Sequence, residues 1–313
     1  MTCRLICFII TVTSIMSSCN HNPVGKDYTD TPTSGVVSIS VDESYSLLFD
    51  TQIYTFEALY PNAKIKVRYQ PEQEALRDLL NDSSKVAVLN RKLTDKESAN
   101  FKASNIFPVT TKIAEDAIAL VVNNNNPDTS LTVNQIKNYL TGADTTWPHN
   151  NKQQINIVFD NPNSANYRYM KELINNANFG KNVFAVKSNP DVISYVSTHE
   201  NAIGIISVNW ISDRDDTLSQ SFLKKVKVVG LTDEMYPNEL TVFKKPWQAY
   251  IANKSYPLCR SVYMINRQTR AGLGTGFVSF VAGEKGQRMM KLAGLVPATM
   301  QIRLIQITHK PLN

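Results

Sequence analysis

Cysteine is scarce in this sequence and poorly placed for cross-linking. Cys3, Cys7 and Cys19 stand at the start of the 313 residues, and Cys259 is the one cysteine that follows. A single thiol cannot form an internal disulfide, so we expect the fold to depend on its hydrophobic core. A hydrophobic share of 42% is enough for one large or two medium cores. We interpret Cys259 as a small buried hydrophobe rather than a nucleophile.

Runs of basic residues are also missing. The formal net charge is +6 and the sequence pI is about 9.0, but the excess is spread along the chain. Nucleic-acid-binding proteins usually gather Lys and Arg on one face or arm, so we expect no nucleic-acid partner. A small anionic ligand, or nearness to an anionic membrane, fits this charge equally well.

No hydrophobic run is long enough to cross a bilayer, which needs roughly twenty residues. The apolar stretch from Leu5 to Met16 follows Arg4 and ends in two serines before Cys19, and it resembles a bacterial lipoprotein signal. We predict that residues 1–19 are a signal peptide and that Cys19 carries lipid. An ordinary secretory peptide cleaved nearby is the alternative. Residues 20–35 read as a flexible tether, and the anchored protein would face the periplasm or stand at the cell surface.

The constellations that carry catalysis or bind metals are missing as well. The four histidines are scattered, and no Ser, His and acid combination suggests a nucleophile, so we expect neither an enzyme, nor a cofactor, nor a metal site. The segment "GLGTGF" (272–277) lacks the preceding strand and the spacing of a nucleotide-binding loop. We predict a turn there, before a long helix.

Strand and helix patterns do alternate along the rest of the chain. Strands favoured by the apolar patterning are 36–41, 64–69, 85–90, 116–123, 155–159, 202–208, 224–231 and 260–265. Helices are predicted from Ser44 to Pro61, over 72–82, 132–142 and 190–199, from about 165, and over 277–294. Strands regularly followed by helices favour parallel sheets covered on both faces. The length and the number of units suggest two lobes.

Several of these segments resemble periplasmic phosphate-binding proteins of ABC transporters, in the order that this family has. They are "RKLTDKE" (91–97), "AEDAIALVVNNNNP" with "LTVNQIKNYLTG", "YPLCRSVYMI" (256–265) and "GFVSFVAGEKGQRMMKLAGLVP". The resemblance implies an α/β, two-lobed periplasmic binding protein fold of type II, with two parallel-rich sheets, a hinge and an interlobe cleft. It places the first lobe at 36–115 plus 262–313 and the second at 116–261. Ligand binding would close the lobes.

Two strand-to-helix junctions have the form of an anion site. Open α/β sheets bind ligands beyond the carboxyl ends of their strands, where helix N-termini point unpaired N–H groups and the helix dipole favours an anion. The first junction carries Asp42, Glu43 and Ser44, and the second carries Asn163, Ser164 and Asn166. Each serine could equally be a plain helix cap.

The resemblance adds a third loop and further candidates. Asn90 and Arg91 stand where the family places its third ligand loop, and Arg91 could instead be an ordinary ion-pair partner. Tyr69, Glu72 and Tyr167 are weaker candidates for the wall of the cleft. At the second junction Asp160 stands where the family keeps an Arg, the usual bidentate partner of a phosphate. A carboxylate next to a phosphate is tolerable only where it accepts a proton that the phosphate still carries.

These features together predict a lipid-anchored solute-binding protein, without enzymatic activity. It would act as a monomer and capture an oxyanion, with inorganic phosphate as the first candidate, for an ABC permease. The acidic first junction and Asp160 support an alternative, in which a divergent member acts as a sensor or interaction lipoprotein for another ligand or for a protein partner.

Overall fold

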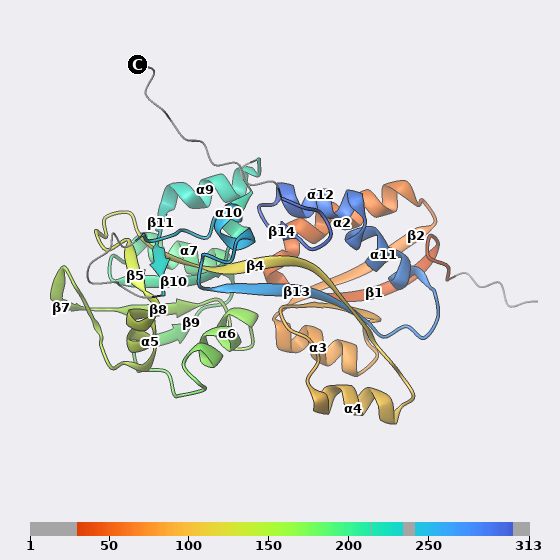
Figure 1. The fold of residues 1–313 in the computed structure, drawn as a ribbon, viewed down its shortest axis with the longest axis horizontal. Coiled ribbons are helices and arrows are strands. Elements are labelled where there is room, and N and C mark those ends of the chain that lie inside the picture. Colours follow the sequence, from red (N-terminus) through yellow and green to blue (C-terminus); the bar gives the residue numbers. More distant parts are fainter. Residues whose placement is uncertain (1–29, 214, 234–241, 303–313) are drawn as a thin grey trace, which may run out of the picture.

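The computed structural model describes residues 30–302, except 214 and 234–241 (Figure 1). No helix within these residues is long and apolar enough to cross a membrane. The predicted signal peptide, Cys19 and the tether up to residue 29 lie outside the described residues.

The strands follow the predicted order closely. They are β1 (Gly35–Asp42), β2 (Ala63–Gln70), β3 (Val86–Leu89), β4 (Val109–Asn123), β5 (Ser130–Thr132), β6 (Thr146–Trp147), β7 (Asn150–Gln154), β8 (Asn156–Phe159), β9 (Val183–Ala185), β10 (Ala202–Ser207), β11 (Val226–Val228), β12 (Gly230–Thr232), β13 (Cys259–Asn266) and β14 (Val296–Pro297). The predicted strand 224–231 is two short strands, since α9 runs on to Lys225.

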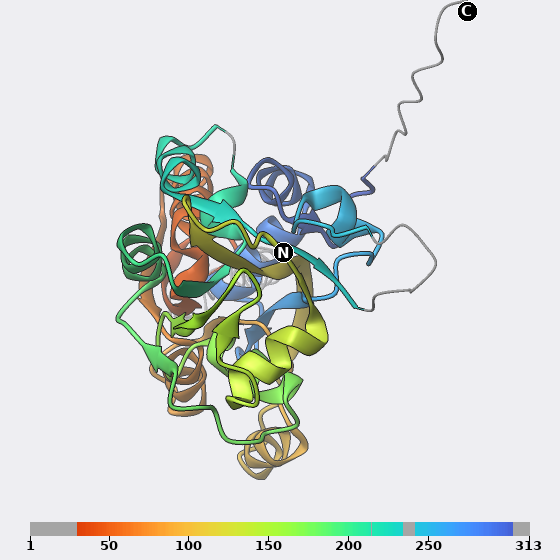
Figure 2. The same ribbon diagram turned by 90° about the vertical axis from the view of Figure 1, so that its left-hand side faces the viewer.

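The helices surround these strands when the molecule is viewed end on (Figure 2). They are the 3-10 turn η2 (Glu43–Tyr45), α2 (Ser46–Leu59), α3 (Glu72–Leu80), α4 (Asp95–Ala103), α5 (Val133–Thr141), α6 (Ala165–Leu173), α7 (Asn189–Thr198), α8 (Asn209–Ser212), α9 (Thr217–Lys225), α10 (Gln248–Ala252), α11 (Leu273–Ala282) and α12 (Glu284–Leu292). Local chemistry sets several ends. For example, α5 begins at a Thr132–Gln135 capping box and ends at Gly142, whose φ of 75° suits glycine.

Two parallel groups of strands are joined by two long antiparallel ones. The main path runs β2-β1-β3-β13-β4-β10-β8-β9. β1 is parallel to β2 and β3, and β8 is parallel to β10 and β9, whereas β4 is antiparallel to both β13 and β10. Residues 117–122 of β4 are all fully buried, as expected for a strand covered on both faces. The two predicted parallel-rich sheets are therefore connected through β4.

Figure 1 shows β4 and β13 running through the middle of the molecule, with one group of elements on each side. We call the group that contains β1, β2, β3, α2, α3, α4, α11 and α12 the first lobe, and the group that contains β8, β9, β10 and α5 to α9 the second lobe. The boundaries predicted at 115/116 and 261/262 fall inside β4 and β13, and they stay a prediction.

Two sequence predictions at the end of the chain were wrong. The predicted helix 277–294 is two helices, because Gly283 adopts an extended ψ of 175° and ends α11 before α12 begins. The "GLGTGF" segment is not a turn, since α11 already begins at Leu273 and only Gly272 precedes it.

The last residues of the predicted tether pack against α11. Asp30 Oδ1 accepts the backbone N–H of Leu273 at 2.7 Å, and Gly276 lies so close to the carbonyl of Pro32 that no larger residue would fit. Thr31 and Ser34 form a backbone bridge just before β1. The fold thus begins a few residues earlier than β1 itself.

Candidate functional site

The first junction is buried and only partly hydrogen-bonded. Asp42 ends β1 and caps η2, since its Oδ1 accepts the N–H of Ser44 at 2.9 Å. Asp42 and Ser44 are buried and Glu43 is half-buried. Asp42 Oδ2, Glu43 Oε1 and Ser44 Oγ have no hydrogen-bond partner. Buried polar atoms without partners are rare in native structures, and they mark places where a ligand or water can bind.

The second junction is buried too, but its side chains satisfy one another. Ser164 caps α6, accepting the N–H of Tyr167 at 3.2 Å and donating its hydroxyl to Asp160 Oδ1 at 2.6 Å. Asn166 and Asn189 both donate to Asp160 Oδ2, at 2.9 and 3.0 Å. Asp160 therefore organises this junction as a buried acceptor.

The third loop divides into an inner and an outer residue. Asn90 is buried, and its side-chain amide donates to Tyr45 Oη at 2.5 Å while its Oδ1 is unpaired. Arg91 instead makes a two-pronged ion pair with Glu97, at 2.8 Å for each N–H. The cap of α4, Thr94 with Glu97, holds that carboxylate in place.

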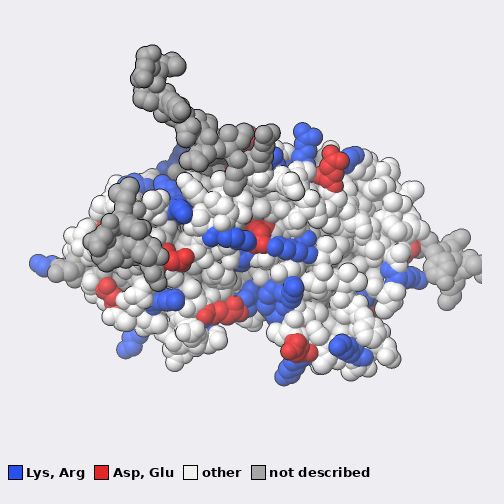
Figure 3. Space-filling model, in the orientation of Figure 1, with Lys and Arg blue, Asp and Glu red and all other residues white. Residues whose placement is uncertain are grey.

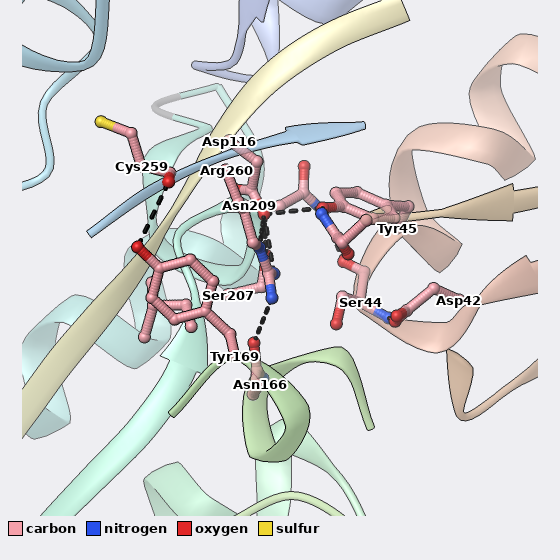
Figure 4. A network of polar contacts seen from close by, with 12 residues as sticks. Asp42, Ser44, Tyr45, Asp116, Asn166, Tyr169, Ser207, Asn209, Cys259 and Arg260 are labelled. Atoms are coloured by element: carbon pink, nitrogen blue, oxygen red, sulfur yellow. Dashed lines mark hydrogen bonds and ion pairs between the residues drawn. The ribbon is translucent and has the colours of Figure 1, made fainter. Parts of the chain in front are cut away.

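A buried arginine that the sequence analysis missed takes part in the network of polar contacts in Figure 4. Arg260 of β13 is directly opposite Asp116 of β4 in the strand register. Its Nε donates to Asp116 Oδ2 at 2.8 Å, and its Nη1 donates to Asn166 Oδ1 at 2.8 Å. Its Nη2 lies 2.7 Å from Asp116 Oδ2 but is not aligned for a hydrogen bond, so one donor group stays unpaired.

The sequence did hold a signal for this pair. Arg260 and Asp116 each open an otherwise apolar strand segment, "RSVYMI" and "DAIALVVN". A buried charge needs a partner, so two opposite charges in buried strands indicate an ion pair between neighbouring strands.

Asp116 collects donors from both lobes as well as from the crossing strand. Tyr45 of the first lobe donates to Asp116 Oδ2 at 2.6 Å, and Ser207 of the second lobe donates to it at 3.1 Å. We call Asp42, Ser44, Asn90, Asp116, Asn166 and Arg260 the cleft cluster. It joins the first and third loops to the second junction.

Burial and charge together set the protonation of the cluster. Burial, and then the charge of Glu72, raises the pKa of Asp42 to about 7, and burial and then Asp160 raise the pKa of Glu43 to about 8. Burial also raises the pKa of Asp160. For Arg260, burial alone would lower the pKa, but Tyr45, Asp116 and Asp42 outweigh it and raise the pKa above its usual value. Near neutral pH the cluster thus holds one firm cation, Arg260, together with Asp42, whose carboxyl group is partly protonated.

The remaining predicted site residues lie around the cluster. Tyr69 donates to Asp50 at 2.5 Å, and Tyr167 packs its ring against Phe159 and Phe179. Asn163 donates to Glu74 Oε1 at 2.8 Å. Glu72 is buried in an ion pair with Arg168. Whether these residues, Arg91 or Ser164 contact a ligand stays a prediction.

Other features of the described chain give no second centre of chemistry. No group of three or more His, Cys, Asp or Glu side chains is placed to hold a metal ion within the part of the chain that the structure describes. Cys259 is half-buried rather than fully buried, and burial raises the pKa of its thiol to about 11. Figure 3 shows Lys and Arg interspersed with Asp and Glu on one face of the molecule.

Proteins of a known family are similar to this chain in sequence and in fold. A sequence model of the PBP superfamily domain matches residues 27–285. The chain belongs to this family. The predicted resemblance to periplasmic phosphate-binding proteins is confirmed, and so is the α/β fold of type II.

Individual members of the PBP superfamily are similar to the chain at low identity. The phosphate-binding protein PstS of Borreliella burgdorferi is 22% identical over 295 residues, covering 91% of this chain and 94% of the relative. The structure of a Clostridium perfringens protein with bound phosphate superposes with a TM-score of 0.69 at 22% identity, covering 84% and 100% of the two chains. An ABC-type phosphate transport receptor from Vibrio cholerae gives a TM-score of 0.63 at 22% identity, covering 83% and 99%. At these identities the likeness shows the fold and leaves the ligand of this chain to be argued from its site.

Proposed function

We propose that this protein captures an oxyanion, inorganic phosphate before others, in the cleft cluster and delivers it to an ABC permease. One observation carries the proposal: the buried Ser44 Oγ has no hydrogen-bond partner, and the buried Arg260 Nη2 has none beyond its ion-pair contact of 2.7 Å with Asp116 Oδ2. A hydroxyl and a guanidinium are the donors that bind phosphate oxygens. The names of the relatives support the same ligand.

Arg260 supplies the positive charge that the second junction lacks. Asp160 stands where the resemblance leads one to expect an Arg, and its oxygens are taken by Ser164, Asn166 and Asn189. Arg260 reaches the same place from β13 by donating to Asn166. We infer that a cation from the crossing strand replaces one from the loop.

The acidic groups of the first junction favour a ligand that carries a proton. Asp42 Oδ2 and Glu43 Oε1 are unpaired, and their pKa values of about 7 and 8 leave them at least partly protonated near neutral pH. Each can donate to an anion while protonated, or accept a proton from it once ionised. Once these groups are ionised, phosphate can still donate a proton to them in a hydrogen bond, whereas sulfate has none to donate, so phosphate should bind more tightly than sulfate, and the more so as the pH rises through 7 to 8.

The anchor and the location belong to the proposal as well. Lipid at Cys19 would tether an exported monomer at the membrane, facing the periplasm, and the two lobes at the predicted boundaries would close over the ligand. None of this requires bond-making chemistry.

A second candidate function rests on the surplus of acid. Asp42, Glu43 and Asp160 lie close enough for their charges to interact, since the charges of Asp160 and Asp42 raise the pKa of Glu43. Such a cleft would also suit a sensor or interaction lipoprotein with a less anionic ligand or a protein partner.

Isothermal titration tests the proposal. We expect saturable phosphate binding near pH 7, competition by arsenate, and much weaker competition by sulfate. Arg260→Lys keeps a charge opposite Asp116 but loses the planar fork, so it should weaken binding by on the order of tenfold or more. Arg68→Lys is the matched control and should leave the affinity unchanged, since Arg68 is paired with Asp78 and belongs to none of the predicted ligand loops.

Absence of phosphate heat would remove phosphate from this account. A thermal-shift screen over other anions, sugars and peptides would then decide for the second function, because a true ligand raises the midpoint with its concentration.

A further inference from the structure

A buried ion pair joins the two lobes beside the cleft cluster. Arg168 of α6 donates from Nε to Glu72 Oε2 at 2.5 Å and from Nη2 to Glu72 Oε1 at 3.2 Å. Glu72 belongs to the first turn of α3. Its side chain is 2% exposed and that of Arg168 is 19% exposed. Figure 1 shows α6 and α3 facing each other from opposite lobes.

Neighbouring contacts cross between the lobes at the same place. Asn163 donates from its side chain to Glu74 Oε1 at 2.8 Å, and its carbonyl accepts the N–H of Gln73 at 3.2 Å. The first turn of α3 and the start of α6 thus form one contact patch.

The ion pair shares both of its elements with the cleft cluster. Glu72 Oε1 also accepts the backbone N–H of Asn90 at 2.7 Å, next to the side chain that bonds Tyr45. On α6, Asn166 lies two residues before Arg168 and accepts from Arg260. Any motion that separates α6 from α3 must therefore move parts of the cleft cluster as well.

Because Glu72 is buried, its ion pair with Arg168 favours the closed arrangement of the lobes over an open one. If the lobes part, water can reach both charges. If they close without Arg168, the Glu72 carboxylate is buried with only the Asn90 N–H to stabilise it, which is costly. Arg168 thus favours closure without touching a ligand.

We propose that Arg168 is a positioning residue whose ion pair with Glu72 latches the two lobes closed and so slows release of the bound ligand. The inference rests on the proposed oxyanion-binding function for its affinity effect. Its effect on lobe closure does not depend on that function.

Two variants in the full-length, detergent-solubilised chain test the latch. Dyes attached through non-natural residues at exposed Tyr54 in α2 and exposed Lys181 in the second lobe report the lobe separation by energy transfer. Without any added ligand, Arg168→Met should lengthen the dye separation. With phosphate as the probe, it should raise koff by on the order of tenfold or more and change kon far less.

The rescue variant separates a latch from a merely structural residue. Glu72→Gln removes the buried charge and keeps an acceptor for the Asn90 N–H, so adding it to Arg168→Met should restore much of the closure. Arg68→Met is the matched control, because it breaks an Arg–Asp pair within the first lobe. Glu172→Gln removes the exposed partner of Arg168 on α6 itself. Both controls should leave dye separation and koff unchanged.

An unchanged dye separation in Arg168→Met would overturn the latch, and so would a change of equal size in Arg68→Met. If the wild-type chain binds no phosphate, the proposed function fails, while the separation in the absence of ligand still decides for or against the latch.

Discussion

Asp42 is a buried carboxyl group with only one of its two oxygens hydrogen-bonded. Burial, followed by Glu72, raises its pKa to about 7, and Arg260 and Ser44 oppose this without cancelling it. An unfolded Asp titrates near about 4, so between these values the folded chain binds the proton more tightly. The stability that this group contributes is therefore complete below about pH 4 and is lost as the pH rises through about 7.

Asp42→Asn should remove this pH dependence. Asn keeps an oxygen for the Ser44 N–H but cannot ionise, so the variant should gain stability relative to wild type at pH 8, by a few kcal/mol at most, and gain about a third as much at pH 5. Urea unfolding at the two pH values measures this difference. Asp95→Asn, at an exposed position in the first turn of α4, should show no such change between the two pH values. An equal Asp42→Asn effect at both pH values would contradict the argument.

At the scale of single elements, the stability that a helix cap contributes depends on which other groups the capping residue contacts. Thr132 caps α5 by exchanging hydrogen bonds with Gln135. Ser164 caps α6 and in addition donates to the buried carboxylate of Asp160. Loss of the Ser164 hydroxyl therefore removes a hydrogen bond from the buried Asp160 side chain as well as from the first turn of α6.

Ser164→Ala should cost more than Thr132→Ala. We expect about 1 kcal/mol for Thr132→Ala, the ordinary value of a cap. For Ser164→Ala we expect about 2–4 kcal/mol, since the loss of a donor to a buried carboxylate is added. Unfolding free energies from urea titration give both numbers. Equal losses would mean that Asp160 does not depend on the Ser164 hydroxyl.

The elements also show how far local sequence signals reach. The bounds of α5, predicted over 132–142, could be read from the sequence because each end depends on residues within a few positions. The break between α11 and α12 was not, because "AGEKG" is compatible with a continuing helix. A Cβ added at Gly286 would clash with the Val281 carbonyl oxygen. The break therefore depends on how closely α11 and α12 pack, which the local sequence does not show.

At the scale of the whole molecule, the domain begins before its first strand. Asp30 accepts the N–H of Leu273 at the start of α11, and Pro32 fits against Gly276. The last residues of the predicted tether are therefore attached to α11 of the first lobe, although α11 lies more than 200 positions later in the chain.

A chain that begins at Gly35 should be less stable than one that begins at Asp30. The shorter chain loses the Asp30 cap of α11 and the Pro32 contact, and we expect a deficit of about 1–2 kcal/mol. Denaturant midpoints of the two chains test this. Asp30→Ala in the longer chain should account for about half of the deficit. Identical midpoints would show that these residues only lie on the surface.

The sequence by itself determined the alternation of strands and helices, the family, and the two junctions, because periodicity and capping depend on near neighbours. Only the tertiary structure decided which charges are buried together. Arg260 bonds a residue 144 positions away and Arg168 one 96 positions away. The packing of β4, β13, α3 and α6 decides which residues become neighbours. Because a buried charge without a partner is costly, the charged residues at these positions occur as pairs. The sequence alone does not show that geometry. It shows only that Asp160 stands where an Arg is expected, and the structure then shows that Arg260 bonds Asn166, which itself bonds Asp160.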